Sequence, residues 1–413
     1  MNNFSLDDFD YYLPQERIAQ YPLPDRDQSN LLVFYPSKII EHHKFFELPN
    51  LLPKGSLLLR NSSKVIPARF FLQKQSGGKV EILLLEPTYP SSDPQLALSS
   101  REKCSWKVLM RGKNLKTGLQ LVLPNYSERN FDMICTINEK NEDHYIVDFE
   151  WANENLQFSE ILEYLGKIPL PPYIHRDDEE LDKERYQTIY GDQLGSVASH
   201  TAGLHFSNNV INELTKNNID FADITLHIGL GTFKPIQSSN IFSHKMHEEK
   251  FSVSLTTLNK IYQFLSNRKE HQIFVAVGTT SVRTLESIFW LAQKIYNNKE
   301  NVIAGNFDIS QYIWKETIAS LTPIQSLEIL LEKMHLNKLE KIEGKTRLYI
   351  TPDYKINFFE AIITNFHQPK STLLLLIYSF VGNEWKRIYK EALEKNYRFL
   401  SYGDASLLFN INK

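Results

Sequence analysis

The stretch QIFVAVGTTSVRTLESIFWLAQKI (Gln272–Ile295) contains one complete strand-to-helix unit. Its first six residues, to Val277, are apolar and rich in β-branched side chains, which is typical of a buried strand. Gly278 and three hydroxyl residues follow, and they supply a turn and a helix cap. The remainder, from Val282, is typical of a helix. A buried strand that leads directly into a helix predicts an α/β sheet.

The same alternation continues on both sides of this unit. Beyond residue 195 the chain reads as strand IDFADITLHI, helix SLTTLNKIYQFLSN, strand FFEAIITNF and helix STLLLLIYSF. Near the N-terminus, LLVFY (Leu31–Tyr35) and SLLLRN (Ser56–Asn61) read as short buried strands. Both ends of the chain therefore contribute to one mixed α/β domain.

The segment from residue 64 to residue 153 follows a different pattern. Six short β-branched or aromatic runs are separated by Gly, Pro, Asn and Ser: VIPARFFLQ, KVEILLLE, SWKVLMRG, LQLVL, FDMICTI and HYIVDFE. Even spacing without a helical period predicts a small antiparallel β-barrel or sandwich. We expect a discontinuous α/β domain (1–63 and 154–413) with an inserted β-barrel domain (64–153). We expect the polar segment 296–343 to be a peripheral helical insertion.

Composition limits the classes of function. The 46 Lys and Arg and 49 Asp and Glu residues give a net charge of −3, so a nucleic acid would have to bind to a local basic patch. Two cysteines, Cys104 and Cys135, are too few for a disulfide framework, a four-cysteine metal site or a three-cysteine radical cluster. The longest apolar run, Leu373–Val381, is far shorter than the roughly 20 residues that span a membrane. We expect a cytoplasmic monomer without a membrane partner.

Five distant segments place polar and ionisable residues beside glycine within otherwise apolar surroundings. They are GSVASHTAGLHF (Gly195–Phe206), LHIGLGTFKP (Leu226–Pro235), HKMH (His244–His247), AVGTTSVRTLES (Ala276–Ser287) and ITNFHQPKST (Ile363–Thr372). Such residues are costly in a core, so their recurrence predicts one site assembled from loops. In an α/β sheet these loops would follow the carboxyl ends of strands, where ligands bind. For each histidine singly, a buried and hydrogen-bonded structural role is the alternative.

Familiar cofactor motifs are absent or incomplete. Gly229 and Gly231 lack the third glycine of a dinucleotide-binding turn, and Leu339 stands where a phosphate-binding loop ending at Gly344-Lys345-Thr346 needs its first glycine. His244 and His247 have spacing that suits two metal ligands, but no further ligand is visible, so we expect no metal. Arg283 lies in the first turn of its helix, where the helix dipole disfavours a cation. This position indicates that a negative charge on a ligand or on the protein answers it.

The chain resembles the S-adenosylmethionine-dependent tRNA ribosyltransferase-isomerases of queuosine biosynthesis over most of its length. Besides the five segments, the resemblance rests on FDYYLPQERIAQYPLPDRDQSNLLVF (Phe9–Phe34), NSSKVIPARF (Asn61–Phe70), GGKVEILLLE (Gly77–Glu86) and YRFLSYGDASLL (Tyr397–Leu408). It implies a β-barrel inserted in an α/β domain, with a cleft between the two. It also implies transfer of the ribosyl group of S-adenosylmethionine to 7-aminomethyl-7-deazaguanine at the wobble position of tRNA. Isomerisation gives epoxyqueuosine and releases adenine and methionine.

The resemblance and the chemistry together suggest roles for individual residues. Proton transfer suits imidazoles, so we expect His205 and His227 to be the acid–base residues and His244, His247 and His367 to be secondary candidates. Hydroxyls and backbone amides suit the polar groups of the co-substrate. For its binding we expect Thr201, Gly203, Gly229, Gly231, Thr279, Thr280, Ser281 and Arg283. Cations suit RNA phosphates, although solvated surface charge is their usual meaning, and here we expect Arg60, Lys64, Arg69, Lys245 and Lys370.

One departure from the family pattern affects the first of these loops. Chains of the family usually carry Ala-Pro where this chain has Ser199-His200. Proline fixes the approach to the loop and histidine does not. Two other functions therefore stay open. A non-catalytic tRNA-binding paralogue is favoured if His205 and His227 are buried and remote from each other. A different S-adenosylmethionine-dependent enzyme of small molecules is favoured if the cleft lacks basic residues.

Overall fold

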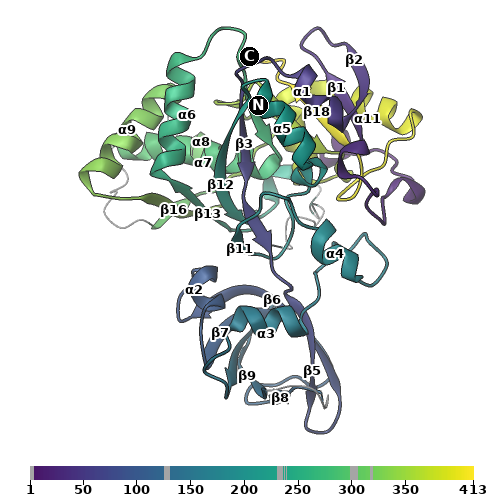
Figure 1. Ribbon diagram of the computed structural model, residues 1–413, viewed down its shortest axis with the longest axis vertical. Helices are drawn as coiled ribbons and strands as arrows, with labels where there is room; N and C mark the ends of the chain where they lie inside the picture. The colour runs from purple at the N-terminus through teal and green to yellow at the C-terminus, as the bar shows by residue number, and fades with distance from the viewer. Residues whose placement is uncertain are drawn as a thin grey trace.

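The computed structural model describes residues 4–124, 131–229, 236, 238, 240–297, 306–316 and 320–413, and these form an α/β domain with a β-barrel below it (Figure 1). Within the described residues the α/β domain is built on a ten-stranded sheet in the order β15-β16-β13-β12-β3-β14-β17-β18-β1-β2. The strands are β1 (Asn30–Phe34), β2 (Ile40–Lys44), β3 (Leu57–Asn61), β12 (Asp220–His227), β13 (Glu249–Ser254), β14 (Phe274–Val277), β15 (Asn306–Ile309), β16 (Lys341–Thr346), β17 (Ala361–Asn365) and β18 (Ala405–Phe409). The predicted fold class is confirmed.

Four neighbouring strands in the middle of the sheet, β12, β3, β14 and β17, are parallel to one another. The C-terminal strand β18 is antiparallel to β17 and parallel to the N-terminal strand β1, so the two ends of the chain meet inside the sheet. β2, β13 and β16 pair antiparallel with their neighbours. Because parallel strands end at the same edge, the loops after β12, β3, β14 and β17 come together there.

Both faces of the sheet are covered, as the alternation of side chains shows. On β1, Leu32 and Phe34 join one apolar core, whereas Leu31 and Val33 join the other. The first core contains residues of α6, α7, α9, α10 and α11, and the second contains residues of α1 and α5. The helices are α1 (Leu48–Leu51), α5 (Asn208–Lys216), α6 (Leu255–Asn267), α7 (Thr279–Tyr296), α8 (Ile313–Glu316), α9 (Pro323–Leu336), α10 (Thr372–Val381) and α11 (Trp385–Glu394).

Helix starts follow local side-chain chemistry. The hydroxyls of Ser207, Ser254 and Ser371 accept hydrogen bonds from backbone amides in the first turns of α5, α6 and α10. At α7 the N-cap is Gly278, whose φ of 85° is a conformation that favours glycine. Its backbone N–H donates to the carbonyl of Ile363 on β17, which fixes this turn beside the next strand.

The inserted domain is a closed six-stranded barrel in the order β10-β7-β6-β5-β8-β9. Its strands, all paired antiparallel, are β5 (Arg69–Lys74), β6 (Lys79–Tyr89), β7 (Lys103–Arg111), β8 (Gln120–Val122), β9 (Met133–Lys140) and β10 (Tyr145–Trp151). Each of the six predicted β segments supplies one strand. Helix α3 (Phe158–Leu165) lies after residue 153, yet its Phe158, Ile161 and Leu162 pack in the barrel core.

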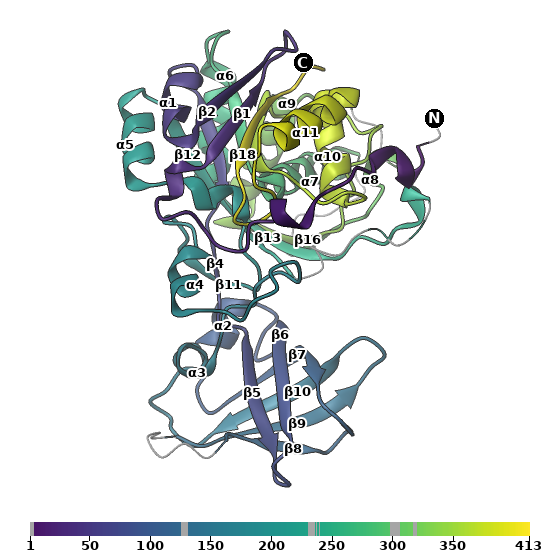
Figure 2. The same cartoon turned by 90° about the vertical axis from the view of Figure 1, so that its right-hand side faces the viewer.

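The barrel leaves and rejoins the sheet at one edge. The chain departs from the carboxyl end of β3 through β4 (Ser63–Val65) and returns through α4 (Glu180–Arg185) and β11 (Gln193–Ser196), which pairs in parallel with β4. Figure 2 shows this connection between the two bodies, with α2 (Pro94–Leu98) on the barrel side of it. The barrel is thus placed at the edge where the loops after the parallel strands gather.

The segment 296–343 differs from expectation. α9 is helical and packs on α6 and α7, but β15 and the first residues of β16 extend the large sheet beyond β13. The expectation of a helical insertion is therefore wrong for the strands. The strand pattern was missed because polar residues alternate with apolar ones on an exposed sheet edge. No helix in the described part of the chain is both long and apolar enough to cross a membrane.

Candidate functional site

A small enclosed pocket lies at the carboxyl ends of the central strands. It collects the loop after β14 (Gly278, Thr279, Thr280), the loop after β17 and the short helix η5 (Thr201–His205) with the two residues before it. The full lining is Tyr173, Ser199, His200, Thr201, Ala202, Ile228, Gly278, Thr279, Thr280, Thr364, Asn365, Phe366, His367, Gln368, Ser371, Leu373, Leu400 and Ser401. Four of the five polar segments of the sequence thus contribute to one cavity.

Several polar groups of the pocket have no hydrogen-bond partner among the described residues. They are the hydroxyls of Ser199 and Thr280 and both ring nitrogens of His200. All three residues are buried, and His200 is 4% exposed. A buried polar group without a partner is costly, so a ligand that supplies the missing partners would be stabilised here.

The pocket is electrically neutral. Burial lowers the pKa of His200 and of His367 to about 3, and Arg60 lowers that of His200 further. Both imidazoles are therefore uncharged at neutral pH. The remaining polar lining consists of hydroxyls and amides, with no Asp, Glu, Lys or Arg. His367 is held in place, because its Nε2 lies 2.9 Å from the Thr364 hydroxyl and its backbone N–H donates to Tyr389.

A larger cleft lies between the barrel and the α/β domain. The barrel domain contributes Leu85, Glu86, Pro87, Pro94, Lys107, Leu109, Asp143 and His144, and the α/β domain contributes Gly195, Val197, His227, Ile228, Gly229, His247, Glu248 and Lys250. The cleft has a volume of 380 Å³, against 60 Å³ for the pocket on the same measure. Ile228 lines both cavities, so the pocket and the cleft are neighbours.

His227 lies in this cleft at the end of β12. Its Nδ1 has no hydrogen-bond partner among the described residues. Burial lowers the pKa of His227 to about 4, with Asp93 opposing and Lys250 adding to the shift. Gly195 makes the close approach possible, since a side chain there would lie 2.4 Å from Pro94 and 3.1 Å from the His227 ring. His227 is thus a neutral imidazole with one free ring nitrogen.

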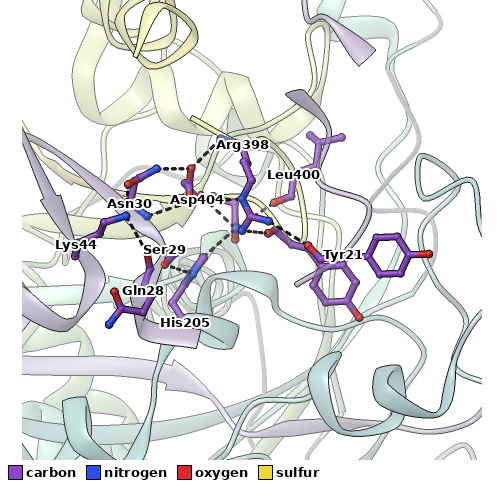
Figure 3. Close-up of polar contacts among 11 residues, drawn as sticks. Tyr21, Gln28, Ser29, Asn30, Lys44, His205, Arg398, Leu400 and Asp404 are labelled. Carbon is purple, nitrogen blue, oxygen red and sulfur yellow. Dashed lines mark hydrogen bonds and ion pairs between the residues drawn. The ribbon is translucent and has the colours of Figure 1, made fainter. Parts of the chain in front are cut away.

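His205 lies elsewhere, in a hydrogen-bonded network that ties both ends of the chain together (Figure 3). Its Nδ1 lies 2.8 Å from the Ser29 hydroxyl and its Nε2 lies 3.1 Å from the Asn365 side-chain nitrogen. Beside it the Asp404 carboxylate accepts hydrogen bonds from the backbone and side chain of Asn30 and from the Arg398 backbone.

The partners of His205 determine its tautomer. Thr201 donates to the side-chain oxygen of Asn365, so the nitrogen of that amide faces His205 and the Leu400 carbonyl. The amide nitrogen is a donor, which makes Nε2 the acceptor and leaves the proton on Nδ1 to be donated to Ser29. Burial and the nearby Arg398 and Arg26 lower the pKa of His205 to about 3. Both ring nitrogens of His205 are therefore used within the protein.

The other residues expected to bind the co-substrate separate into two groups. Thr201, Thr279 and Thr280 line the pocket, and Gly229 lines the cleft. The Ser281 hydroxyl instead donates to the Val277 carbonyl within α7. Gly203 is required by packing, because a side chain there would lie 2.2 Å from the Tyr190 hydroxyl. Gly231 lies outside the described residues.

Most of the expected cations are answered by carboxylates of the protein. Arg283 is buried and pairs with Glu249, which places the negative charge predicted for it on the protein. The remaining placements are Arg60 with Asp223 at 2.6 Å, Arg69 with Glu81 at 2.6 Å, and Lys370 with Asp7 at 2.9 Å and Asp10 at 3.0 Å. Lys64 and Lys245 are exposed.

The HKMH segment divides between the cleft and the core. His247 is exposed and lines the cleft. His244 packs edge-on against Tyr349 with ring centres 5.9 Å apart, and burial with the nearby His247 lowers its pKa. Among the described residues, no group of three or more His, Cys, Asp and Glu side chains is arranged to hold a metal ion.

Sequence reasoning missed several lining residues. In the pocket these are Tyr173, Gln368 and Ser401, and in the cleft they are Lys107, Glu248 and Lys250. Gln368 lies within a quoted polar segment and could have been found there. Lys107 and Lys250 lie in ordinary alternating strands, and nothing in that pattern distinguishes a residue that faces a cleft from one that faces solvent.

Comparisons with known proteins give one result. A family model described as queuosine biosynthesis protein matches residues 6–408. The S-adenosylmethionine:tRNA ribosyltransferase-isomerase of Thermosipho melanesiensis is 36% identical over 416 residues, which cover 98% of this chain and 99% of the relative. The enzyme of the same name from Thermotoga petrophila is 36% identical over 404 residues, covering 97% and 98%. A crystal structure of S-adenosylmethionine tRNA ribosyltransferase from Thermotoga maritima is 28% identical, covers 97% of this chain and 99% of that one, and has a TM-score of 0.45.

Proposed function

The chain belongs to the queuosine biosynthesis protein family of tRNA ribosyltransferase-isomerases, and we propose that its substrates are S-adenosylmethionine and tRNA carrying 7-aminomethyl-7-deazaguanine at the wobble position. The ribosyl group is transferred to the exocyclic amine of that base and isomerised to an epoxycyclopentanediol. Adenine and methionine leave, and epoxyqueuosine remains in the anticodon. The match over residues 6–408 is the observation that carries this proposal.

The arrangement of the two cavities supports a reaction between a small donor and an RNA. The pocket is enclosed and uncharged, and the adjoining cleft is larger and lined by Lys107 and Lys250. Lysines at a cleft suit phosphates of an anticodon loop, and the cleft gives a base turned out of its stack a route toward the pocket. The two cavities meet at Ile228, and we place the reacting atoms there.

His227 is the best-placed group for proton transfer. The sulfonium of S-adenosylmethionine acidifies the neighbouring carbon, so a neutral imidazole can take the proton there. His227 is neutral, lines the cleft and has an unpartnered Nδ1. His247 and His144 line the same cleft and are further candidates.

His205 has a different role in this proposal. Both of its ring nitrogens bond to protein groups, and its partner Asn365 also accepts from Thr201, which lines the pocket. We infer that His205 is a positioning residue that holds η5 and Asn365 in place. Thr201 is thereby fixed at the pocket wall.

One observation favours a second candidate, a tRNA-binding paralogue without turnover. His205 and His227 line separate cavities, so they form no acid–base pair across one substrate. The small-molecule alternative loses support, because Lys107 and Lys250 make the cleft basic.

The test is a turnover assay with purified protein, S-adenosylmethionine and an anticodon stem-loop bearing the aminomethyl-deazaguanine base. Adenine release and the mass of the modified nucleoside are followed. We expect conversion to the epoxyqueuosine mass, and we expect His227→Ala to lower kcat about 10²–10⁴-fold. His335→Ala, at an exposed site on α9, is the matched control and retains full activity. Binding of the stem-loop without adenine release by the wild-type chain would instead establish the non-catalytic paralogue.

A further inference from the structure

We propose that the enclosed pocket binds the adenine base of the donor and that His200 recognises it by hydrogen bonding. This inference rests on the proposed function, because it assigns one part of S-adenosylmethionine to one cavity. It concerns a residue of this chain that stands where the family usually has proline.

The first observation is the cluster of unpartnered polar atoms. The hydroxyls of Ser199 and Thr280 and both ring nitrogens of His200 are buried without partners among the described residues. Hydroxyls and a neutral imidazole both donate and accept. A purine offers the complementary set, with ring nitrogens that accept and an exocyclic amine that donates.

The second observation is the absence of charge from the lining. The described pocket has no carboxylate, ammonium or guanidinium group, and its two imidazoles are neutral. A carboxylate, an ammonium or a phosphate would be poorly stabilised in such an enclosed and uncharged space. The methionine end of the donor carries two charges beside the sulfonium, so it belongs outside the pocket. Adenine is the uncharged end.

The third observation is the size and character of the walls. The pocket has less than a sixth of the volume of the cleft, 60 Å³ against 380 Å³. Its apolar lining includes Phe366, Leu373 and Leu400, and an apolar cavity with a few polar groups is typical of sites for flat heterocycles. The sugar carries too many hydroxyls for these walls, whereas a base matches them.

The position of His200 limits what else it can do. Its backbone carbonyl accepts from Gly203, and a side chain on Gly203 would lie 3.1 Å from the His200 ring. The Tyr190 ring centre lies 5.9 Å away on a neighbouring segment. The imidazole is thus confined by packing and bonded to no described residue. A proline at this position would offer the ligand no hydrogen bond.

The experiment is calorimetry of the full chain with S-adenosylhomocysteine, adenine and methionine as separate probes. We expect His200→Ala to raise the Kd for S-adenosylhomocysteine and for adenine about tenfold, and to leave the methionine value unchanged. His200→Asn retains a donor and an acceptor and should restore part of the affinity. Thr280→Val should act in the same direction as His200→Ala. Thr284→Val is the matched control, because the Thr284 hydroxyl bonds to the Thr280 carbonyl within α7 and its residue is absent from the pocket lining.

Steady-state kinetics separates this inference from the proposed function. If the proposal is right, His200→Ala raises KM for S-adenosylmethionine and leaves KM for the stem-loop unchanged. A rise in the stem-loop KM alone would assign the pocket to the acceptor base and overturn the inference. Turnover with unaltered donor affinity in His200→Ala would also overturn it while leaving the proposed function intact. A wild-type chain that binds adenine but shows no turnover would overturn the proposed function and not the site.

Discussion

The enclosed pocket and the interdomain cleft meet at Ile228, yet they are built from opposite kinds of side chain. The pocket belongs almost entirely to the α/β domain and carries hydroxyls, amides and neutral imidazoles. The cleft is shared with the barrel and carries Lys107, Lys250, Glu86 and Glu248. The difference indicates that the two cavities separate a substrate's uncharged part from charged groups, and each prediction below alters one cavity and tests the other.

The largest effect should come from placing a charge in the pocket. Thr280→Asp buries a carboxylate that no described cation answers, and we expect it to lower the free energy of unfolding by about 3–5 kcal/mol and to abolish S-adenosylhomocysteine binding. Urea denaturation and calorimetry measure the two effects. Thr280→Val, which keeps the volume without charge, should fold nearly as well as the wild type. Equal stability of the Asp and Val variants would show that the pocket is wetter than described.

The second effect is a pH dependence that belongs to the pocket's neutral imidazoles. His367 has a folded pKa of about 3 and an unfolded value near 6.5, so between these values the unfolded chain binds the extra proton. Stability contributed by the neutral form is therefore present above pH 6.5 and is lost as the pH falls. Between pH 7 and pH 5 this one group should cost about 2 kcal/mol. Denaturation of His367→Asn should show a pH dependence that is weaker by that amount, and an unchanged slope would contradict a neutral buried imidazole.

A smaller effect is expected from the cleft. Lys250→Ala should weaken binding of the stem-loop about five- to tenfold and reduce the slope of log affinity against log salt by about one. Affinity for S-adenosylhomocysteine should stay the same, because Lys250 does not line the pocket. Fluorescence anisotropy over a salt series measures the change. Lys390→Ala on α11, outside both cavities, serves as the control, and equal losses in the two variants would refute a local basic patch.

The smallest effect concerns the outer support of the pocket. Lys370 pairs with Asp7 and Asp10, and Tyr11 donates to the His367 carbonyl, so the N-terminal segment holds the loop after β17. Surface ion pairs contribute little, so Lys370→Met should change the Kd for S-adenosylhomocysteine by no more than about twofold. Tyr11→Phe provides the comparison from the buried side of the same contact. A large loss in Lys370→Met would mean that the cation itself meets the ligand.

Much of the fold could be predicted from the sequence because its strands carry clear periodicity. The six β segments of the barrel and the strand-to-helix unit at Gln272–Ile295 have the expected structure. The strands of 296–343 escaped because an edge strand with polar neighbours lacks that pattern. Pairing order within the sheet was beyond reach, since β18 joins β1 and β17 through contacts that span nearly the whole chain.

The site was predictable as a set of loops and not as a set of roles. Strand ends bring Thr201, Thr279, Thr280 and His367 to one pocket, as the α/β pattern implies. The partners of His205, Ser29 and Asn365, are 176 and 160 residues away, so no local pattern could reveal that the ring is fully bonded. Likewise, the choice of Lys107 over other barrel lysines depends on how the barrel is oriented.

The place of β18 has a consequence for synthesis of the chain. β1 and β2 are the first strands to leave the ribosome, but β1 joins the rest of the sheet only through β18, which ends four residues before the C-terminus. The N-terminal hairpin must therefore wait, with its β18-facing edge unpaired, until translation is complete. A product truncated by its last ten residues would lose that connection and leave two open sheet edges where the full chain has none. Such fragments are natural targets for degradation rather than partly active enzymes.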